Sequence, residues 1–142
     1  EVIDMEAYAE AYLTDVVENQ GKLFDYVSQH YEGYDTEDFI NAYMTSKTRK
    51  SIDEAMAYVN TMGALELLGY FLETDKYSFK LGETLKGFLP EWIGEFYAYY
   101  QWYYFMPSSE VVAKIPVSFL KKAYPGLHDL DLELAVKKVG IV

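Results

Sequence analysis

The sequence contains no cysteine, a single arginine, two histidines and four prolines. Without cysteine there is no disulfide framework and no thiolate for catalysis or metal binding, which fits a reducing compartment. The histidines, His30 and His128, lie outside E-x-x-H and H-E-x-x-H spacings, which excludes di-iron bundles and helix-borne zinc proteases. Glycine-rich phosphate loops and the Gly-x-Ser-x-Gly nucleophile elbow are also missing. We therefore expect no metal and no cofactor.

The length of 142 residues suits one domain, here residues 1–142, and 51% hydrophobic residues are enough for a core. The most apolar stretch, residues 88–106, contains Glu91, Glu95 and Gln101. These polar residues favour a buried helix over a membrane span. The first residues are acidic, so the basic start of a signal peptide is missing and we expect a cytoplasmic protein without membrane contact.

The negative charge is concentrated near the start of the chain. The sequence carries 23 acidic and 12 basic residues, and residues 1–45 hold eleven of the acids with Lys22 as their one base. An acidic surface repels nucleic acid and anionic lipid and attracts cationic partners. We therefore expect no direct nucleic-acid binding and consider a basic protein partner. The alternative, that the charge only keeps the protein soluble, stays open.

Residues 4–31 follow the period of one long amphipathic helix, with Asp4 as N-cap and a break near Gly21 as the alternative. Its apolar side carries Met5, Ala9, Tyr12, Val16, Leu23 and Val27, and its opposite side carries Asp15, Glu18, Asp25 and Glu32. A second helix opens with further acids. The predicted partner-binding residues are Asp15, Glu18, Asp25, Glu32, Asp35, Glu37 and Asp38.

The remaining pattern predicts helices over residues 51–59, starting at a capping box on Ser51, and over residues 62–73. Alternating aromatics at residues 76–88 favour a short β-hairpin or an extended arm. A central helix over residues 90–105 follows, in which Trp92 and Trp102 should both be largely buried. Helices from Ser108, over 116–124 and over 129–139 complete the chain. The expected fold is an all-α, irregular or orthogonal bundle of about seven helices around the aromatic-rich helix.

Two residue pairs could support chemistry, although each has an ordinary structural interpretation. Glu91 and Glu95 stand one helical turn apart, a spacing that allows acid–base work or a metal, or simply a first-turn acid followed by a surface acid. His128 and Asp129 resemble the dipeptide of metal-dependent phosphohydrolases, which need further histidines. We expect instead that Asp129 caps the last helix and that His128 completes a turn.

The aromatic run could fill a core, form a protein interface or line a small-molecule pocket, and the sequence leaves these three open. Arg49 lies in the one basic cluster. It could bind an anion together with the helix start at Ser51, or pair with the acids of the first helix. The candidate pocket residues are Arg49, Trp92, Tyr100 and Tyr103.

One resemblance covers residues 44–140. It rests on Trp92-Ile93-Gly94, the aromatic run at 97–104, Pro107-Ser108-Ser109 and Leu127-His128-Asp129-Leu130-Asp131. These features look like a small bacterial protein family with no assigned chemistry. The resemblance implies a bacterial, cytoplasmic setting and transfers no catalytic residue.

These observations favour a small acidic protein that binds a basic protein partner, as inhibitors, antitoxins and immunity proteins do. One alternative is an enzyme or small-molecule binder that uses the aromatic helix with Glu91, Glu95 or His128. A second alternative is a nucleic-acid mimic, whose acids would occupy a basic groove.

Overall fold

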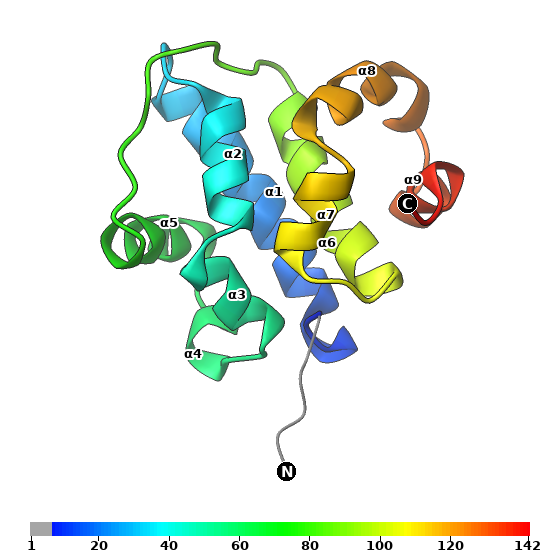
Figure 1. Ribbon diagram of the computed structural model, residues 1–142, viewed down its shortest axis with the longest axis horizontal. Helices are drawn as coiled ribbons and strands as arrows, with labels where there is room; N and C mark the ends of the chain where they lie inside the picture. Colours follow the sequence, from blue (N-terminus) through cyan, green and yellow to red (C-terminus); the bar gives the residue numbers. More distant parts are fainter. Residues whose placement is uncertain (1–6) are drawn as a thin grey trace.

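Two long antiparallel helices form the centre of the fold: α1 (Leu13–His30) and α6 (Leu89–Tyr103). The computed structural model describes residues 7–142 (Figure 1). The two helices approach so closely at Gly21 and Gly94 that a Cβ on Gly94 would lie 2.5 Å from the backbone oxygen of Gln20. The two glycines therefore set the spacing of the central pair.

The other helices surround this pair, and the all-α prediction is confirmed, with 68% of the structure helical. They are the 3₁₀ turn Glu10–Tyr12, α2 (Thr36–Met44), α3 (Lys47–Asp53), α4 (Ala57–Asn60), α5 (Ala64–Thr74), α7 (Ser108–Lys114), α8 (Val117–Leu127) and α9 (Leu132–Val139). Within the described residues, no helix is both long and apolar enough to cross a membrane.

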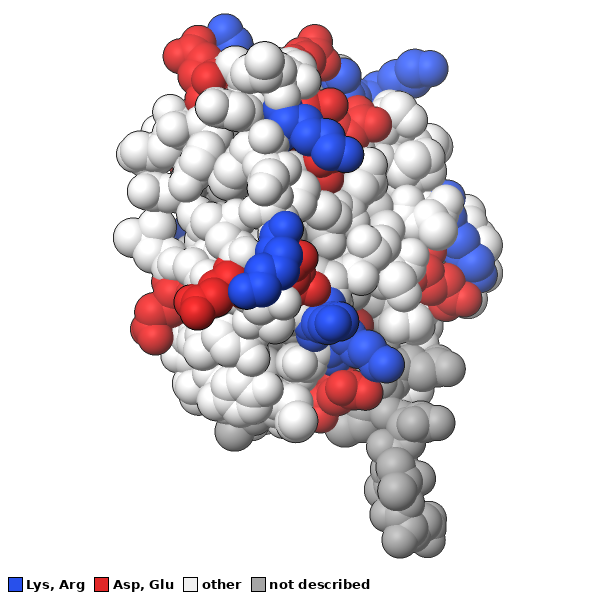
Figure 2. Space-filling view, turned by 60° about the vertical axis from the view of Figure 1, so that its left-hand side comes forward, with Lys and Arg blue, Asp and Glu red and all other residues white. Residues whose placement is uncertain are grey.

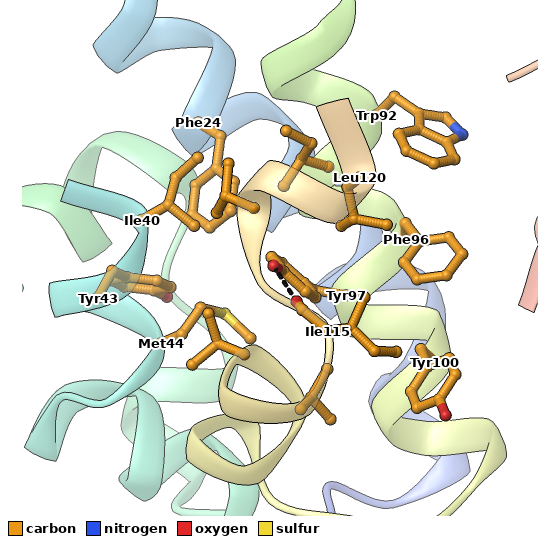
Figure 3. Close-up of a cluster of buried hydrophobic side chains, with 14 of the residues drawn as sticks. Phe24, Ile40, Tyr43, Met44, Trp92, Phe96, Tyr97, Tyr100, Ile115 and Leu120 are labelled. Atoms are coloured by element: carbon orange, nitrogen blue, oxygen red, sulfur yellow. Dashed lines mark hydrogen bonds between the residues drawn. The ribbon is translucent and has the colours of Figure 1, made fainter. Parts of the chain in front are cut away.

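The main core lies where α2, α6 and the α7–α8 region meet (Figure 3). The side chains of Ile40, Tyr43 and Met44 come from α2 and are almost completely buried. Opposite them, the Tyr97 hydroxyl donates to the carbonyl oxygen of Ile115 at 2.6 Å. That bond satisfies the polar tip of a buried tyrosine, which is the condition for using tyrosine as core filling.

A hairpin does not form at residues 76–88: this segment is an extended arm, and the described residues contain no strand. The arm leaves α5, crosses the ends of α1 and α2 and reaches α6 (Figure 1). Its backbone pairs with residues 33–36, as in the bond from Asp35 N to the Lys80 oxygen at 2.7 Å. Phe79 stacks on Phe39 and Tyr31, so aromatic packing on the helices replaces a second strand.

Two predicted helix starts in the first half of the chain are wrong. The first helix begins at Leu13, and its proposed N-cap, Asp4, lies outside the described residues. It then continues through Gly21 without a break. The third helix begins at Lys47 instead of Ser51, because Ser46 accepts a hydrogen bond from Arg49 N at 2.9 Å and Asp75 accepts one from Lys47 N at 2.8 Å.

The end of the chain also departs from the predicted boundaries. α8 passes through Pro125 and ends at Leu127. The next residue, His128, stacks its ring on Tyr124, and its backbone N–H donates to the Tyr124 oxygen. The last helix is preceded by Asp131, so the prediction that Asp129 caps it is wrong. A proline removes one helical hydrogen bond, and here the ring stacking and the backbone bond between His128 and Tyr124 follow it in the last turn.

Candidate functional site

Three carboxylates meet where α1 and α6 cross, and we call Glu18, Lys22, Glu91 and Glu95 the acidic seam. The absent side chain of Gly21 makes room for them. A Cβ there would lie 2.8 Å from Cγ of Glu95 and 3.3 Å from Cγ of Glu91, so both glutamates lie across the glycine. The sequence placed Glu18 on a separate helix from the other two acids, and only the helix crossing brings them together.

The seam contains one lysine for three carboxylates. Lys22 Nζ lies 2.7 Å from Glu18 Oε1, and this bond lowers the pKa of Glu18 and raises that of Lys22. Glu95 has no such partner among the described residues. Partial burial, followed by the charges of Glu91 and Glu18, raises its pKa. The seam therefore keeps an uncompensated negative charge that costs stability.

The other predicted partner-binding acids differ in their contacts: Glu32 lies 3.7 Å from Lys86, and Asp25 accepts a hydrogen bond from Gln29 at 3.0 Å. Asp15 and Glu32 are exposed, and Asp25 is half-buried one turn beyond Lys22. Asp35 and Asp38 make hydrogen bonds inside the fold. Asp35 Oδ1 caps α2 by accepting from Asp38 N at 2.9 Å, and Asp38 accepts from Tyr77 at 2.8 Å and faces Lys80 at 3.6 Å. Glu37 is half-buried in the same turn.

The face shown in Figure 2 differs from the seam. Acidic and basic side chains lie next to one another on it, and neither sign gathers into a large patch. Elsewhere in the fold an ion pair joins α8 to the arm, with Lys121 Nζ 3.0 Å from Glu83 Oε1. The surplus of acids in the sequence is thus uneven in space as well as along the chain.

The candidate catalytic residues do not assemble into one centre. His128 Nε2 lies 3.1 Å from Asp129 Oδ1 and its Nδ1 lies 2.8 Å from the Tyr124 oxygen, so both ring nitrogens have local partners. No hydrogen bond or ion pair among the described residues joins this pair to Glu91 or Glu95. Within those residues, no group of three or more His, Cys, Asp or Glu side chains could hold a metal ion.

Arg49 is completely buried, and neither of its predicted partners is correct. Its guanidinium donates to Asp53 Oδ1 at 2.5 Å, to Gln20 Oε1 at 2.7 Å and to Gln101 Oε1 at 2.6 Å. It lies 5.7 Å above the ring of Tyr8. The arginine thus joins α1, α3 and α6 in a closed polar network, and it is neither an anion site nor a partner of acids on the first helix.

Asp53 completes this network from the other side. It also accepts hydrogen bonds from the side chain of Gln101 and, at 3.1 Å, from the backbone N–H of Ser108 at the start of α7. The sequence analysis missed the network, although two signals could have revealed it. Gln20 follows Val16 on the buried stripe of α1, and Gln101 is the polar residue within an aromatic run. A buried amide needs polar partners, and the sole arginine could supply them.

The aromatic pocket candidates are packed rather than arranged around a cavity. Trp92 is buried against Phe96 and Tyr124, and the Tyr100 hydroxyl donates to the Gly140 oxygen at 2.7 Å. Tyr103 is partly buried, with Lys137 Nζ 5.9 Å above its ring.

Trp102 is only partly buried, which corrects the expectation that both tryptophans are core residues. It packs at the edge of a small cluster that includes Leu13 and Val17 of α1.

Comparison with protein-family models, with curated proteins and with solved structures found no match to this chain.

Proposed function

We propose that the protein is a small acidic binding protein that recognises a basic protein partner through the acidic seam, as an inhibitor, antitoxin or immunity protein does. The observation that carries the proposal is the convergence of Glu18, Glu91 and Glu95 where α1 and α6 cross, with Lys22 bonded to Glu18. The bacterial, cytoplasmic setting suggested by the resemblance belongs to this proposal.

The physical argument is that the seam is unfavourable in the free protein. Glu95 is partly buried and lies near the charges of Glu91 and Glu18, which disfavour its ionised form and raise its pKa, and among the described residues no cation pairs with it because Lys22 is bonded to Glu18. A lysine or arginine from a partner would offset these charges and would also approach faster in the negative field.

The experiment compares two variants with the same change in net charge. The seam variant carries Glu18→Gln, Glu91→Gln and Glu95→Gln. The control variant carries Glu54→Gln, Glu66→Gln and Glu73→Gln, which alters three exposed acids elsewhere. Each immobilised protein is used to capture partners from a bacterial extract at low and moderate salt, and the captured proteins are identified by mass spectrometry.

We expect wild type and control to retain a basic protein that the seam variant loses, and we expect added salt to weaken the capture by wild type. The purified partner should then bind the seam variant at least about tenfold more weakly, mainly through slower association. Equal capture by both variants would contradict a role for the seam. Equal loss from both would mean that net charge alone is responsible.

A further inference from the structure

An open groove of about 600 Å³ lies beside the seam, between the second half of α1 and the end of the arm. Its α1 wall carries Asp25, Gln29 and Glu32, its other wall is the segment 84–88, and Glu91 closes one end. Asp25 and Glu91 place the groove directly next to the acidic seam.

The groove is negatively charged, and the one lysine that lines it makes only a weak ion pair. Asp25, Glu32 and Glu91 face a single lysine, Lys86, whose Nζ lies 3.7 Å from Glu32 Oε1. Both members of this pair are highly exposed, and such pairs contribute little to stability. A cationic side chain from outside can therefore replace Lys86 next to Glu32 without disturbing the fold.

The groove also offers a fixed apolar contact. Phe88 is 78% exposed at its rim, while Leu85 lies buried beneath it. The turn before Phe88 uses Gly87 at φ 68°, and the backbone N–H of Leu85 donates to Thr36 Oγ1 at 3.0 Å. The arm is thus anchored to α2, and the ring of Phe88 is presented to solvent from a rigid base, which lowers the entropic cost of binding.

We propose that this groove binds a segment of the basic partner in which lysine or arginine alternates with an aliphatic side chain. The cations would lie against Asp25, Glu32 and Glu91, and the aliphatic side chain would pack on Phe88. The inference rests on the proposed function, because it specifies where and through which chemistry the basic partner is held. Charge complementarity selects this occupant over an acidic segment or a second copy of this acidic chain.

The test uses a defined probe, an acetylated and amidated peptide of alternating arginine and leucine, with a second peptide in which serine replaces leucine. Binding to the full chain is followed by backbone amide chemical shifts and by titration. The variants are Phe88→Ser, which removes the apolar contact, and Phe119→Ser, which makes the same change on exposed α8. Serine suits the N-cap position that Phe88 occupies, so the first variant should fold.

We expect the arginine–leucine peptide to shift amides at residues 25–32 and 84–91 and to bind about tenfold more tightly than the serine peptide. Phe88→Ser should remove most of that tenfold advantage, whereas Phe119→Ser should retain it. Absence of peptide binding, or equal effects of the two variants, would overturn the inference.

The outcome for the groove can be separated from that for the proposed function. If the peptide shifts amides around Glu18 and Glu95 instead, the assignment of the binding site to the groove is wrong, while the proposed role of the seam is still supported. The same holds if the natural partner is lost by the seam variant and retained in full by Phe88→Ser. If the partner binds the seam variant normally but is lost by Phe88→Ser, the groove is the binding site and the proposed role of the seam is wrong.

Discussion

Substitution of Gly94 by alanine tests whether the central helix pair depends on close backbone contact. A Cβ at this position would lie 2.5 Å from the oxygen and 2.8 Å from the carbonyl carbon of Gln20, and 2.9 Å from Cα of Gly21. All three are backbone atoms of α1, so no side chain can rotate to relieve the overlap, and the two helices must separate.

The magnitude follows from three opposing contributions. Alanine gains about 1 kcal/mol over glycine inside a helix. Overpacking costs about 1–3 kcal/mol. Separation of the helices also weakens the 2.8 Å bond from Gln20 Nε2 to the Gly94 oxygen, which is worth about 1 kcal/mol. Gly94→Ala should therefore lower the free energy of unfolding by about 1–3 kcal/mol, and the Tm by about 3–10 °C in a chain of this size.

Two further glycines serve as controls. At Gly69 in α5 a Cβ meets nothing within 4 Å, so Gly69→Ala should stabilise the protein by up to about 1 kcal/mol. At Gly21 the nearest atom is the flexible Glu95 Cγ, so Gly21→Ala should fall between the other two. Urea unfolding followed by far-ultraviolet circular dichroism measures all three. If Gly94→Ala proves as stable as Gly69→Ala, the inferred backbone contact is wrong.

Four further predictions use the same unfolding assay or a titration. Arg49→Met should lower the free energy of unfolding by about 3–5 kcal/mol, because Asp53 then stays buried without its cation. A decrease below about 1 kcal/mol would contradict the network. Burial raises the pKa of Tyr43 from 10.0 to about 12, so its phenolate absorbance should develop late and stability should fall as pH rises between these values. Glu95→Gln should stabilise the protein at neutral pH, and the gain should vanish in acid, where the glutamate is protonated because its pKa is raised; a stabilisation independent of pH would refute the electrostatic origin. Ala55→Gly should raise the free energy of unfolding by about 0.5–1 kcal/mol, because Ala55 adopts φ 59°, a left-handed conformation that glycine tolerates. Unchanged or reduced stability would argue against strain at this position.

Local patterns predicted the helices whose signals are contained within a few residues. Asp35 starts α2 because its side chain caps a neighbouring N–H, and Phe39, Ile40, Tyr43 and Met44 are buried because they share one helix face. The central helix follows from Pro90 and from the aromatic run after it. Capping and periodicity act within one or two turns, so they can be identified without knowledge of the fold.

Boundaries were wrong where distant residues control the ends of a helix. Ser51 has the spacing of a cap, yet Asp75 binds the N–H groups of Lys47 and Thr48 and moves the start of α3 forward. α6 ends at Tyr103, two residues before Phe105, which adopts a left-handed conformation, and α8 continues through Pro125. At α3 the competing contact comes from Asp75, a residue far away in the sequence, which a local pattern does not contain.

The sequence by itself determined that this is an all-α protein with an acidic start, an aromatic central helix and few residues suited to catalysis. Only the tertiary structure decided which polar residues meet. It buries Arg49 with Asp53, and it brings Glu91 and Glu95 against Glu18 across Gly21. Helix period fixes the face on which a residue lies, whereas the crossing of two helices, set here by contact between Gly21 and Gly94, fixes which faces meet.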